Sequence, residues 1–264
     1  MTSQIYPMAP ALDRAGLARS DFCIPVIPHA EPEGKSLREN GTQKKNHGKP
    51  GTKREFSLNR DAMFAVWRDG SCHIISESYF YKTGPYYEIL RHELEGKPVR
   101  PGSSAVLDAY VVPVCLERAH LAGIPVCEWG ISQGYTPLPA VLYGLNYFAT
   151  ASEYRVVRDN EEAKEAIKHI TNKGKYPFCY QQLIDDAALH SCVAVFGKTS
   201  GTCAEVAGIA RAIYDLFAIP LVSLVMVHDK NGYRLTSLSS VRYSHLSAEE
   251  RALLLAYLSH QEFL

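Results

Sequence analysis

The residues that most readily suggest chemistry lie in a short polar stretch that follows an apolar run over residues 191–196. After Gly197 come one lysine and several hydroxyl side chains, and a helical pattern begins at Thr202. A strand, a polar loop and a helix N-terminus together present unpaired backbone N–H groups and the positive end of a helix dipole, which attract an anion. We therefore expect an anion site whose candidate residues are Lys198, Thr199, Ser200 and Thr202. The alternative is an ordinary capped turn. The stretch is not a Walker A loop, since Cys192 stands where that motif requires glycine.

Tyrosines crowd a second polar stretch, residues 78–87, which leads from a predicted strand into a predicted helix. Its candidate ligand-binding residues are Tyr79, Tyr81, Lys82, Thr83 and Tyr86. In an open parallel sheet, ligands gather beyond the carboxyl ends of the strands, where this loop is expected to lie. The alternative is that the tyrosines pack the helix against the sheet and direct their hydroxyls to water.

The cysteines and histidines do not indicate a metal site. The 7 cysteines form no C-x-x-C pair, so we expect reduced, mostly buried thiols in a cytoplasmic protein. Cys203 falls in the first turn of a predicted helix, where an exposed thiol has a lowered pKa, but a buried thiol is the favoured interpretation. The 10 histidines show no pair at helical ligand spacing, and we predict no bound metal.

Composition excludes some classes of protein. Over 264 residues, lysine plus arginine equals aspartate plus glutamate at 28 each, so no overall field favours nucleic acid or membrane. No apolar run approaches the ~20 residues that span a bilayer, and charged residues interrupt the N-terminal stretch where a signal peptide is apolar. Residues 1–57 are predicted to be a disordered basic tail containing prolines, most simply a solvated linker, with a nucleic-acid arm as the alternative.

The elements that position the tyrosine-rich stretch, residues 78–87, are predicted over residues 58–150. Strands are expected over 63–67, 72–75 and 124–127, and helices over 86–94 and about 103–122, the second divided at Pro113. Strands that alternate with helices indicate a Rossmann-like α/β region with a parallel, doubly covered sheet. Residues 128–150, which contain Gly130, Gly134, Pro137 and Pro139, are predicted to be a loop and a domain junction.

Residues 151–264 are predicted to form an α+β sandwich with a C-terminal helix. The expected order is β-α-β-β-α-β-β, similar to a split βαβ (ferredoxin-like or ATP-grasp-like) arrangement with an added strand. Capping boxes are expected at Asp159 with Glu162, Thr202 with Glu205, and Ser247 with Glu250. On the helix that starts near residue 159, Glu161–Lys164 and Glu165–Lys168 have the spacing of ion pairs.

Two segments resemble the N-terminal domain of RimK-like ATP-grasp proteins. The first is Ser78-Tyr79-Phe80-Tyr81-Lys82-Thr83-Gly84-Pro85-Tyr86-Tyr87, similar to that family's tyrosine-rich run opening a helix. The second is Val195-Phe196-Gly197-Lys198-Thr199 with the later Phe217-Ala218-Ile219-Pro220-Leu221, similar to its Phe-Gly-Arg-Thr turn and Phe-x-x-Pro-Leu strand. The resemblance runs from about Cys72 to the C-terminus. Lys198 stands where the family tends to carry arginine, which weakens a bidentate anion contact.

In that family the domain usually precedes an ATP-grasp module, which joins a carboxylate to an amine through an acyl phosphate. The chain ends after one short further helix, so the resemblance implies a stand-alone domain without the ligase module. Our main expectation is a non-catalytic accessory or recognition domain, without a cofactor, that binds a small anion, a peptide or a partner ATP-grasp ligase in trans. The resemblance also implies that residues 81–83 and 198–200 border one cleft. The alternative is that the two loops lie on separate faces of the molecule.

Two other functions remain open from the sequence. One is an ATP-grasp-type carboxylate–amine ligase or a degenerate relative that binds ATP and Mg²⁺. Such ligases present a Glu-x-Asn on the strand that here reads Leu235-Thr236-Ser237-Leu238-Ser239-Ser240, which counts against metal binding there. The other is a regulatory or structural protein docked by its basic tail. Whether the chain is an enzyme on its own is left open, and no catalytic residue is assigned.

Overall fold

The computed structural model describes residues 23–25, 57–146, 149–184 and 187–259. Most of the expected basic tail therefore lies outside the described residues. Three of the described residues of that segment form strand β1 (Cys23–Pro25), which pairs antiparallel with β2.

The first sheet, sheet A, has the strand order β1-β2-β3-β4. Its remaining elements are β2 (Met63–Arg68), β3 (Ser71–Ser76), helix α1 (Gly84–Leu94) and β4 (Val99–Arg100). The α/β class is confirmed, since α1 joins the parallel strands β3 and β4. Strands β2 and β3 are antiparallel instead, because Asp69 and Gly70 take positive φ angles of 50° and 73° and close a tight hairpin.

Two helices follow sheet A, α2 (Ser103–Tyr110) and α3 (Val112–Leu121). The predicted division at Pro113 is confirmed: Val111 is extended between them, and the proline lies in the first turn of α3. The strand predicted over residues 124–127 is reduced to a single parallel bridge between Val126 and Leu235.

Sheet C, a second sheet, corrects the prediction of a loop over residues 128–150. Its order is β5-β8-β6-β7. Its strands are β5 (Trp129–Ser132), β6 (Ala140–Gly144), β7 (Arg155–Val157) and β8 (Phe178–Gln182), covered by α4 (Asn160–Ile170). Gly130 suggested a loop but lies inside a strand, where a Cβ atom would come within 2.5 Å of the Tyr180 hydroxyl. The boundary expected at residue 150 thus falls within one sheet.

Sheet B is antiparallel, with the order β10-β9-β11-β12. Its elements are β9 (Ala188–Val195), β10 (Lys198–Thr199), α5 (Ala204–Phe217), β11 (Leu221–Asp229) and β12 (Gly232–Ser239), followed by the 3-10 turn η1 (Tyr243–His245) and α6 (Ala248–Leu258). The predicted order β-α-β-β-α-β-β is found with the two-residue strand β10 added before α5, but its strands divide between sheets C and B. Strand β8 pairs with β5 on one side and β6 on the other, so neither edge is left for β9.

The helix caps follow the sequence at two of three places. Ser247 and Glu250 form the predicted capping box, and Asp159 accepts from the backbone N–H groups at the start of α4. The box expected at Thr202 is wrong. Cys203 is the N-cap of α5, and Glu205 accepts instead from the backbone N–H of Tyr233 at 2.9 Å.

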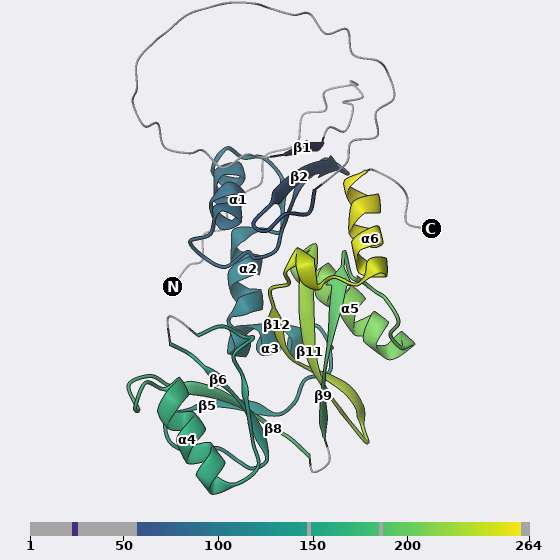
Figure 1. The fold of residues 1–264 in the computed structure, drawn as a ribbon. Helices are drawn as coiled ribbons and strands as arrows, with labels where there is room; N and C mark the ends of the chain where they lie inside the picture. Colours follow the sequence, from purple (N-terminus) through teal and green to yellow (C-terminus); the bar gives the residue numbers. More distant parts are fainter. Residues whose placement is uncertain (1–22, 26–56, 147–148, 185–186, 260–264) are drawn as a thin grey trace, which may run out of the picture.

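The three sheets meet around α2 and α3, which run from α1 toward sheet C (Figure 1). One large apolar cluster joins sheets A and B with α1, α2, α3 and α5, and a smaller cluster lies between sheet C and α4. Among the described helices, none has the length and apolarity needed to cross a membrane.

Candidate functional site

The strongest candidate site is a recess of about 290 Å³ at the α2–α3 corner, opposite the segment that follows β6. We call it the junction recess. Its lining residues are Phe80, Tyr81, Val106, Leu107, Tyr110, Val111, Val112, Pro113, Gly144, Leu145, Asn146, Ala149, Thr150 and Ala151. A smaller cavity of about 80 Å³ shares part of this wall and reaches Ser239 and Ser240 at the end of β12. The recess therefore lies where elements of all three sheets converge.

Local structure explains how the walls are held. Pro113 breaks the helix because it has no N–H to bond the carbonyl of Ala109 and its ring clashes with that carbonyl, so Val111 is extended between α2 and α3. Leu107 and Val111 are 40% and 44% exposed at this corner. The loop before α1 is fixed by Tyr79, whose hydroxyl accepts from the backbone N–H of Ser76 at 2.9 Å and donates to the carbonyl of Ile74 at 3.1 Å. These bonds set the position of Phe80 at the rim.

Tyr110 is the distinctive side chain of this wall. It lines both cavities, and its hydroxyl oxygen is buried without a hydrogen-bond partner among the described residues. Burial raises the pKa of Tyr110 well above its ordinary value, so the hydroxyl stays protonated and able to donate. A buried hydroxyl without a partner costs about 1–3 kcal/mol, a cost that a group bound in the recess can remove.

The recess carries no charge of its own. Its polar side chains are the hydroxyls of Tyr81, Tyr110 and Thr150 and the amide of Asn146, and no lysine, arginine, aspartate, glutamate or histidine lines it among the described residues. Desolvating a charged ligand group without an opposite charge is costly. The wall therefore favours an uncharged ligand rather than the small anion expected from the sequence.

The five candidate residues of the 78–87 loop lie in different surroundings in the structure. Tyr79 is fully buried in the core, and Tyr86 is 8% exposed and packs edge-on against Tyr81. Of the five candidates, Tyr81 alone lines the junction recess. Lys82 is exposed at φ 72°, with its ammonium 5.0 Å from the centre of the Tyr81 ring, and the Thr83 hydroxyl donates to the carbonyl of Phe80 at 2.6 Å.

The stretch that follows Gly197 is not a strand–loop–helix anion site of the expected form. Phe196 and Gly197, with φ of 51° and 72°, turn the chain back on itself, so Lys198 and Thr199 form the short edge strand β10. The hydroxyls of Thr199 and Thr202 bond each other. Ser200 is half-buried and Lys198 is exposed. The backbone between β9 and β10 is therefore an ordinary turn.

The two candidate loops lie apart. Strand β10 is one edge of sheet B, whereas Phe80 lies beside Ser239 and Ser240 at the end of β12, the opposite edge. Residues 81–83 and 198–200 therefore do not border the one cleft that was expected. The first loop lies near the α2–α3 corner, and the second lies at β10.

Sequence reasoning missed most of the recess. The sequence places Tyr110 only within a predicted helix, and it places Asn146 and Thr150 in a segment predicted to be a loop and a domain junction. One signal was available: Pro113 indicated a helix break at this corner. Nothing in the spacing of these residues connected that corner with residues 144–151.

The ligase alternative requires residues on β12 that can hold Mg²⁺ beside ATP. Magnesium is held by carboxylate or amide oxygens, but Ser237 and Ser239 present hydroxyls. The Ser237 hydroxyl accepts from the Tyr143 hydroxyl at 3.1 Å and donates to the carbonyl of Ala151 at 3.5 Å. Within the part of the chain that the structure describes, no group of three or more His, Cys, Asp or Glu residues is placed to hold a metal. The donor set on β12 does not fit Mg²⁺.

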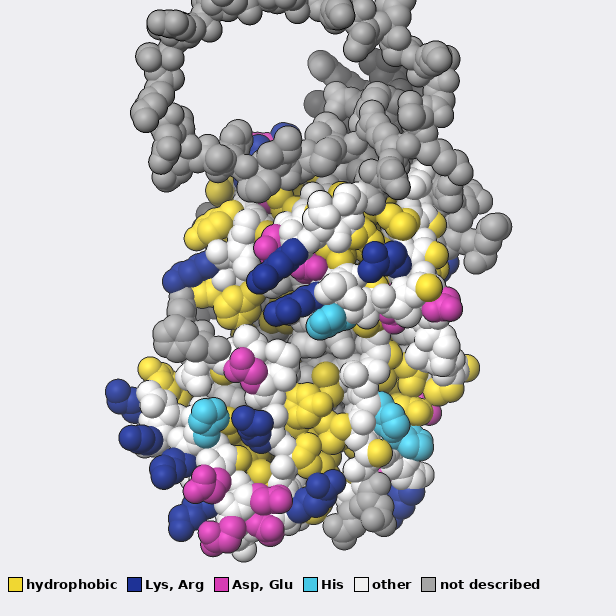
Figure 2. Space-filling view, viewed as in Figure 1, with side chains coloured by type: hydrophobic (Ala, Val, Ile, Leu, Met, Phe, Trp, Pro, Cys, Tyr) yellow, Lys and Arg dark blue, Asp and Glu magenta, His cyan; other side chains and the backbone are white. Residues whose placement is uncertain are grey.

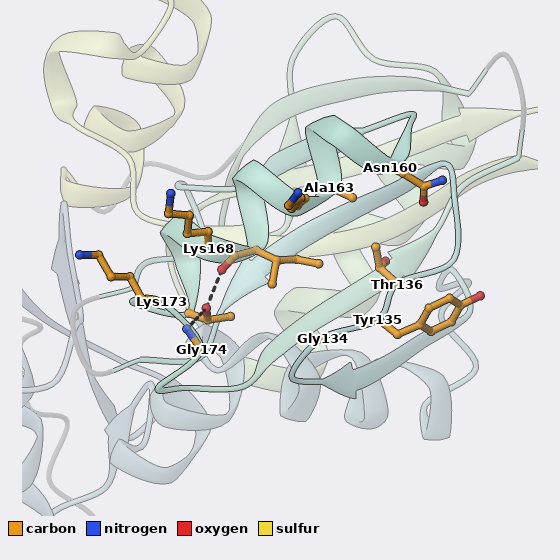
Figure 3. A pocket seen from close by; sticks show the side chains of 11 residues that line it. Gly134, Tyr135, Thr136, Asn160, Ala163, Lys168, Lys173 and Gly174 are labelled. Atoms are coloured by element: carbon orange, nitrogen blue, oxygen red, sulfur yellow. Dashed lines mark hydrogen bonds between the residues drawn. The ribbon is translucent and has the colours of Figure 1, made fainter.

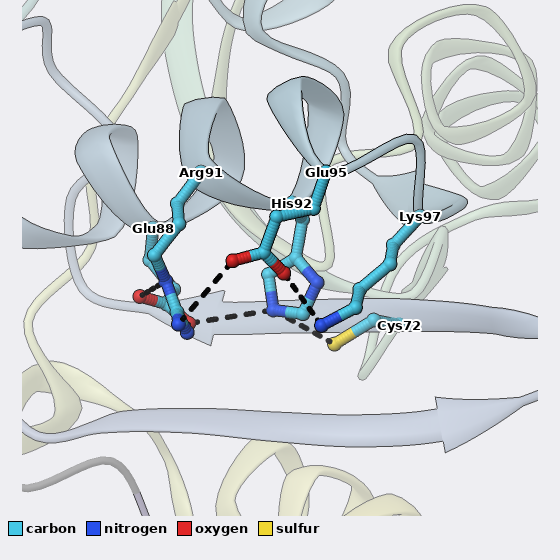
Figure 4. A network of polar contacts seen from close by, with 6 residues as sticks. All are labelled: Cys72, Glu88, Arg91, His92, Glu95 and Lys97. Carbon is cyan, nitrogen blue, oxygen red and sulfur yellow. Dashed lines mark hydrogen bonds and ion pairs between the residues drawn. The ribbon is translucent and has the colours of Figure 1, made fainter.

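A cysteine, a histidine and a glutamate on β3 and α1 lie in the order that a nucleophilic site would require (Figure 4). The Cys72 sulfur lies 3.9 Å from His92 Nε2, which lies 3.3 Å from the Glu88 carboxylate. Burial, with a smaller contribution from Glu88, raises the pKa of Cys72 to about 11, so the thiol is protonated near neutral pH and is not an activated nucleophile. Together with the surrounding ion pairs of Arg91, Glu95 and Lys97, the group holds α1 against sheet A.

The thiols agree in part with the sequence prediction. Cys72, Cys115, Cys127 and Cys179 are buried and reduced, and Cys192 is half-buried. Cys203 is exposed at the N-cap of α5, so the expectation that it is buried is wrong.

Comparison with known proteins gives likenesses of fold. No family model and no curated protein sequence matches the chain. Among solved structures, a RimK domain protein ATP-grasp from Sphaerobacter thermophilus aligns with 17% identity and a TM-score of 0.49, covering 66% of this chain and 75% of that one. D-alanine–D-alanine ligase from Helicobacter pylori aligns with 13% identity and a TM-score of 0.49, covering 66% of this chain and 65% of the ligase.

A third structure, the ATP-grasp ligase PsnB complexed with minimal precursor, Mg and ADP, aligns with 15% identity and a TM-score of 0.46 over 66% of each chain. The aligned regions thus span less than two thirds of the length of the two ligases.

Proposed function

We propose that this chain is a recognition protein whose junction recess binds the uncharged, ring-bearing part of a small molecule or peptide. The observation that carries the proposal is the buried Tyr110 hydroxyl, which lacks a partner among the described residues at the wall of an otherwise apolar recess. An apolar wall with a few convergent polar groups is the usual composition of a ligand site.

The size of the recess limits which ligands can fit. A main cavity of about 290 Å³ and a smaller one of about 80 Å³ share lining residues that include Phe80 and Tyr110. Small-molecule sites begin at roughly this size, so the bound part is about one ring with a short substituent. The aromatic rim favours a flat group, and a hydroxyl or carbonyl at its inner end would pair with Tyr110.

The experiment is an NMR titration of the full chain with three single-ring probes of different charge: p-cresol, phenylacetate and benzylamine. We expect p-cresol to bind with a dissociation constant of about a millimolar, as is usual for a fragment of this size. The charged probes are expected to bind more weakly, because no opposite charge lines the recess. Tightest binding by phenylacetate would contradict this proposal and restore the small-anion expectation.

Filling the recess provides the matched control. Leu107 lines it and is 40% exposed on α2, so Leu107→Trp should keep the fold while blocking the space. Leu121 is 76% exposed on α3 and lies outside the recess, so Leu121→Trp should bind p-cresol as the wild type does. Equal binding by both variants would place the probe elsewhere and overturn the proposal.

An ATP-dependent carboxylate–amine ligase is the second candidate, since the solved structures that align with this chain include D-alanine–D-alanine ligase and the ATP-grasp ligase PsnB. Its weakness is the hydroxyl donor set of β12. Calorimetric titration with ATP in the presence and absence of Mg²⁺ tests it directly. Mg²⁺-dependent binding would favour the ligase, whereas binding of p-cresol without any response to Mg²⁺ and ATP would favour the recognition protein.

A partner ATP-grasp protein is a further proposal that the recess allows, because a peptide side chain of such a partner has the required chemistry. Co-purification from the native host, repeated with Leu107→Trp, checks it. Docking through residues 1–57 concerns a segment that lies almost entirely outside the described residues.

A further inference from the structure

A second cavity, of about 450 Å³, lies between α4 and the loop that joins β5 to β6 (Figure 3). It is separate from the junction recess and shares no lining residue with it. Its walls carry Lys164 and Lys168 from α4 and Lys173 from the turn after α4, with no aspartate or glutamate among the lining residues. At the other end in Figure 3 are Tyr135, Thr136 and Asn160.

None of the three lysines forms an ion pair with a described residue. The ion pairs predicted from spacing, Glu161–Lys164 and Glu165–Lys168, are absent from the ion pairs formed in the described structure, which involve other residues. Lysines four residues apart on one helical face repel each other, at a cost of about 0.2–0.5 kcal/mol. Figure 2 shows lysine and arginine side chains gathered at this end of the molecule, with acidic side chains grouped beside them.

The turn after α4 holds the third lysine in place. Asn172, Lys173 and Gly174 have positive φ angles of 51°, 59° and 84°. The Thr171 hydroxyl accepts from the backbone N–H of Gly174 at 2.8 Å, and the Lys173 N–H donates to the carbonyl of Lys168 at 2.8 Å. A left-handed backbone at two non-glycine residues is uncommon and is maintained here by these bonds.

Helix stabilisation explains only part of this arrangement. Cations near a helix C-terminus interact favourably with the helix dipole, which accounts for Lys168 and Lys173. The effect fades beyond the last turn, so it does not account for Lys164, which lies in the middle of α4. An anionic ligand between the lysines accounts for all three.

We propose that this cavity binds a phosphorylated small molecule through Lys164, Lys168 and Lys173. Three exposed lysine side chains along one cavity suit a group with more than one negative charge, and phosphate oxygens accept charge-assisted hydrogen bonds from lysine. The cavity is within the usual size range of small-molecule sites, so it has room for a body beyond the phosphate. That body lies against Tyr135, Thr136 and Asn160, which offer a ring, a hydroxyl and an amide.

The test is calorimetric titration of the full chain with inorganic pyrophosphate at low salt, with citrate as a carboxylate probe of high charge. We expect saturable binding of pyrophosphate, tighter than that of citrate, and weaker binding as salt screens the lysines. Each of Lys164→Met, Lys168→Met and Lys173→Met should weaken it roughly tenfold by removing one charge-assisted contact. Lys168→Arg, which keeps the charge, should stay close to the wild type.

Lys175→Met is the matched control, because Lys175 is an exposed lysine two residues beyond Lys173 and does not line the cavity. Equal weakening by Lys175→Met would show attraction to general positive charge and overturn the site. Absence of saturable pyrophosphate binding would do so as well, and tighter binding of citrate would overturn the phosphate assignment. Circular dichroism of each variant separates loss of a contact from loss of fold.

Discussion

Tyr110 is the residue on which the ligand proposal rests, and its hydroxyl can be removed without changing the ring. Phenylalanine keeps the packing of Tyr110 at the end of α2 and deletes a buried donor that has no partner in the described structure. We expect Tyr110→Phe to raise the free energy of unfolding by about 1 kcal/mol and to weaken p-cresol binding. Urea denaturation measures the first effect. A loss of stability instead would show that the hydroxyl is satisfied, for example by an ordered water.

His73 makes stability depend on pH in a defined direction. It is 5% exposed and lies beside the stacked rings of Phe196 and Tyr257, with its ring centre about 6 Å from each. Burial, with a smaller effect from Arg100, lowers the pKa of His73 from 6.5 to about 4. Because folding lowers this pKa, the unfolded chain takes up the proton first, and stability present near neutral pH is lost as the pH falls from about 6.5 to 4.

The variant His73→Gln removes this titration. Its free energy of unfolding should change less than that of the wild type across the same pH window, as measured by urea denaturation at several pH values. His245→Gln, at an exposed position, is the control and should follow the wild-type profile. A His73→Gln profile as steep as that of the wild type would assign the pH dependence to other groups.

At the residue scale, sequence could suggest which side chains are capable of chemistry but not which of them meet. Tyr81 was identified and does line the recess, yet Lys82 beside it does not, because its positive φ leaves its side chain exposed. Lys164 and Lys168 carried a readable signal, two like charges on one helical face. The sequence instead predicts two ion pairs, because the neighbouring glutamates have the right spacing. Only the structure shows that these ion pairs do not form.

At the scale of elements, the turn between β9 and β10 depends on Gly197. A Cβ atom there would lie 2.7 Å from the Cβ of Tyr214, in addition to the strain of φ 72°. Gly197→Ala should therefore lower the free energy of unfolding by about 2–4 kcal/mol, combining backbone strain with a clash inside the core. Gly201→Ala is the matched control, since it has φ 66° but nothing within 4 Å, and should lose only about 1 kcal/mol.

Chemical denaturation of both glycine variants measures the difference. Similar losses would mean that Tyr214 and α5 shift to accept the methyl group, and that the turn is held less tightly than its contacts suggest.

Elements with a regular apolar period could be predicted from sequence, whereas short strands flanked by glycine and proline could not. Helices α4, α5 and α6 and the hairpin of β11 and β12 follow their patterns. Strands β5 and β6 were missed because Gly130 and the prolines before Ala140 signal loops locally. The glycine is needed for contact with Tyr180, a partner about fifty residues away that no local pattern reveals.

At the scale of the whole molecule, sheets B and C are joined by a few buried polar contacts. Strand β12 has a bulge opposite Val225 and Met226, and the Thr236 carbonyl at this bulge accepts from Gln181 Nε2 at 2.7 Å. Gln181 is fully buried, so this hydrogen bond is shielded from water. Division of the chain into three sheets could not be predicted, because it depends on such long-range contacts.

Gln181→Met keeps the side-chain volume and removes the donor, leaving the Thr236 carbonyl without this partner. We expect the free energy of unfolding to fall by about 1–3 kcal/mol, with faster amide hydrogen exchange in sheet C than in sheet A. Gln182→Met, at the exposed neighbouring position, should leave both quantities unchanged. Uniform exchange across the molecule would contradict the idea that this bond joins two separable parts.

The central claim is that the junction recess is a ligand site, and a crystal structure of the full chain soaked with p-cresol tests it most directly. The account predicts the ring between Leu107 and Phe80, with its hydroxyl within about 3 Å of the Tyr110 hydroxyl. An ordered water bonded to Tyr110 in a recess that stays otherwise empty at saturating probe, or a recess closed by neighbouring side chains, would contradict it.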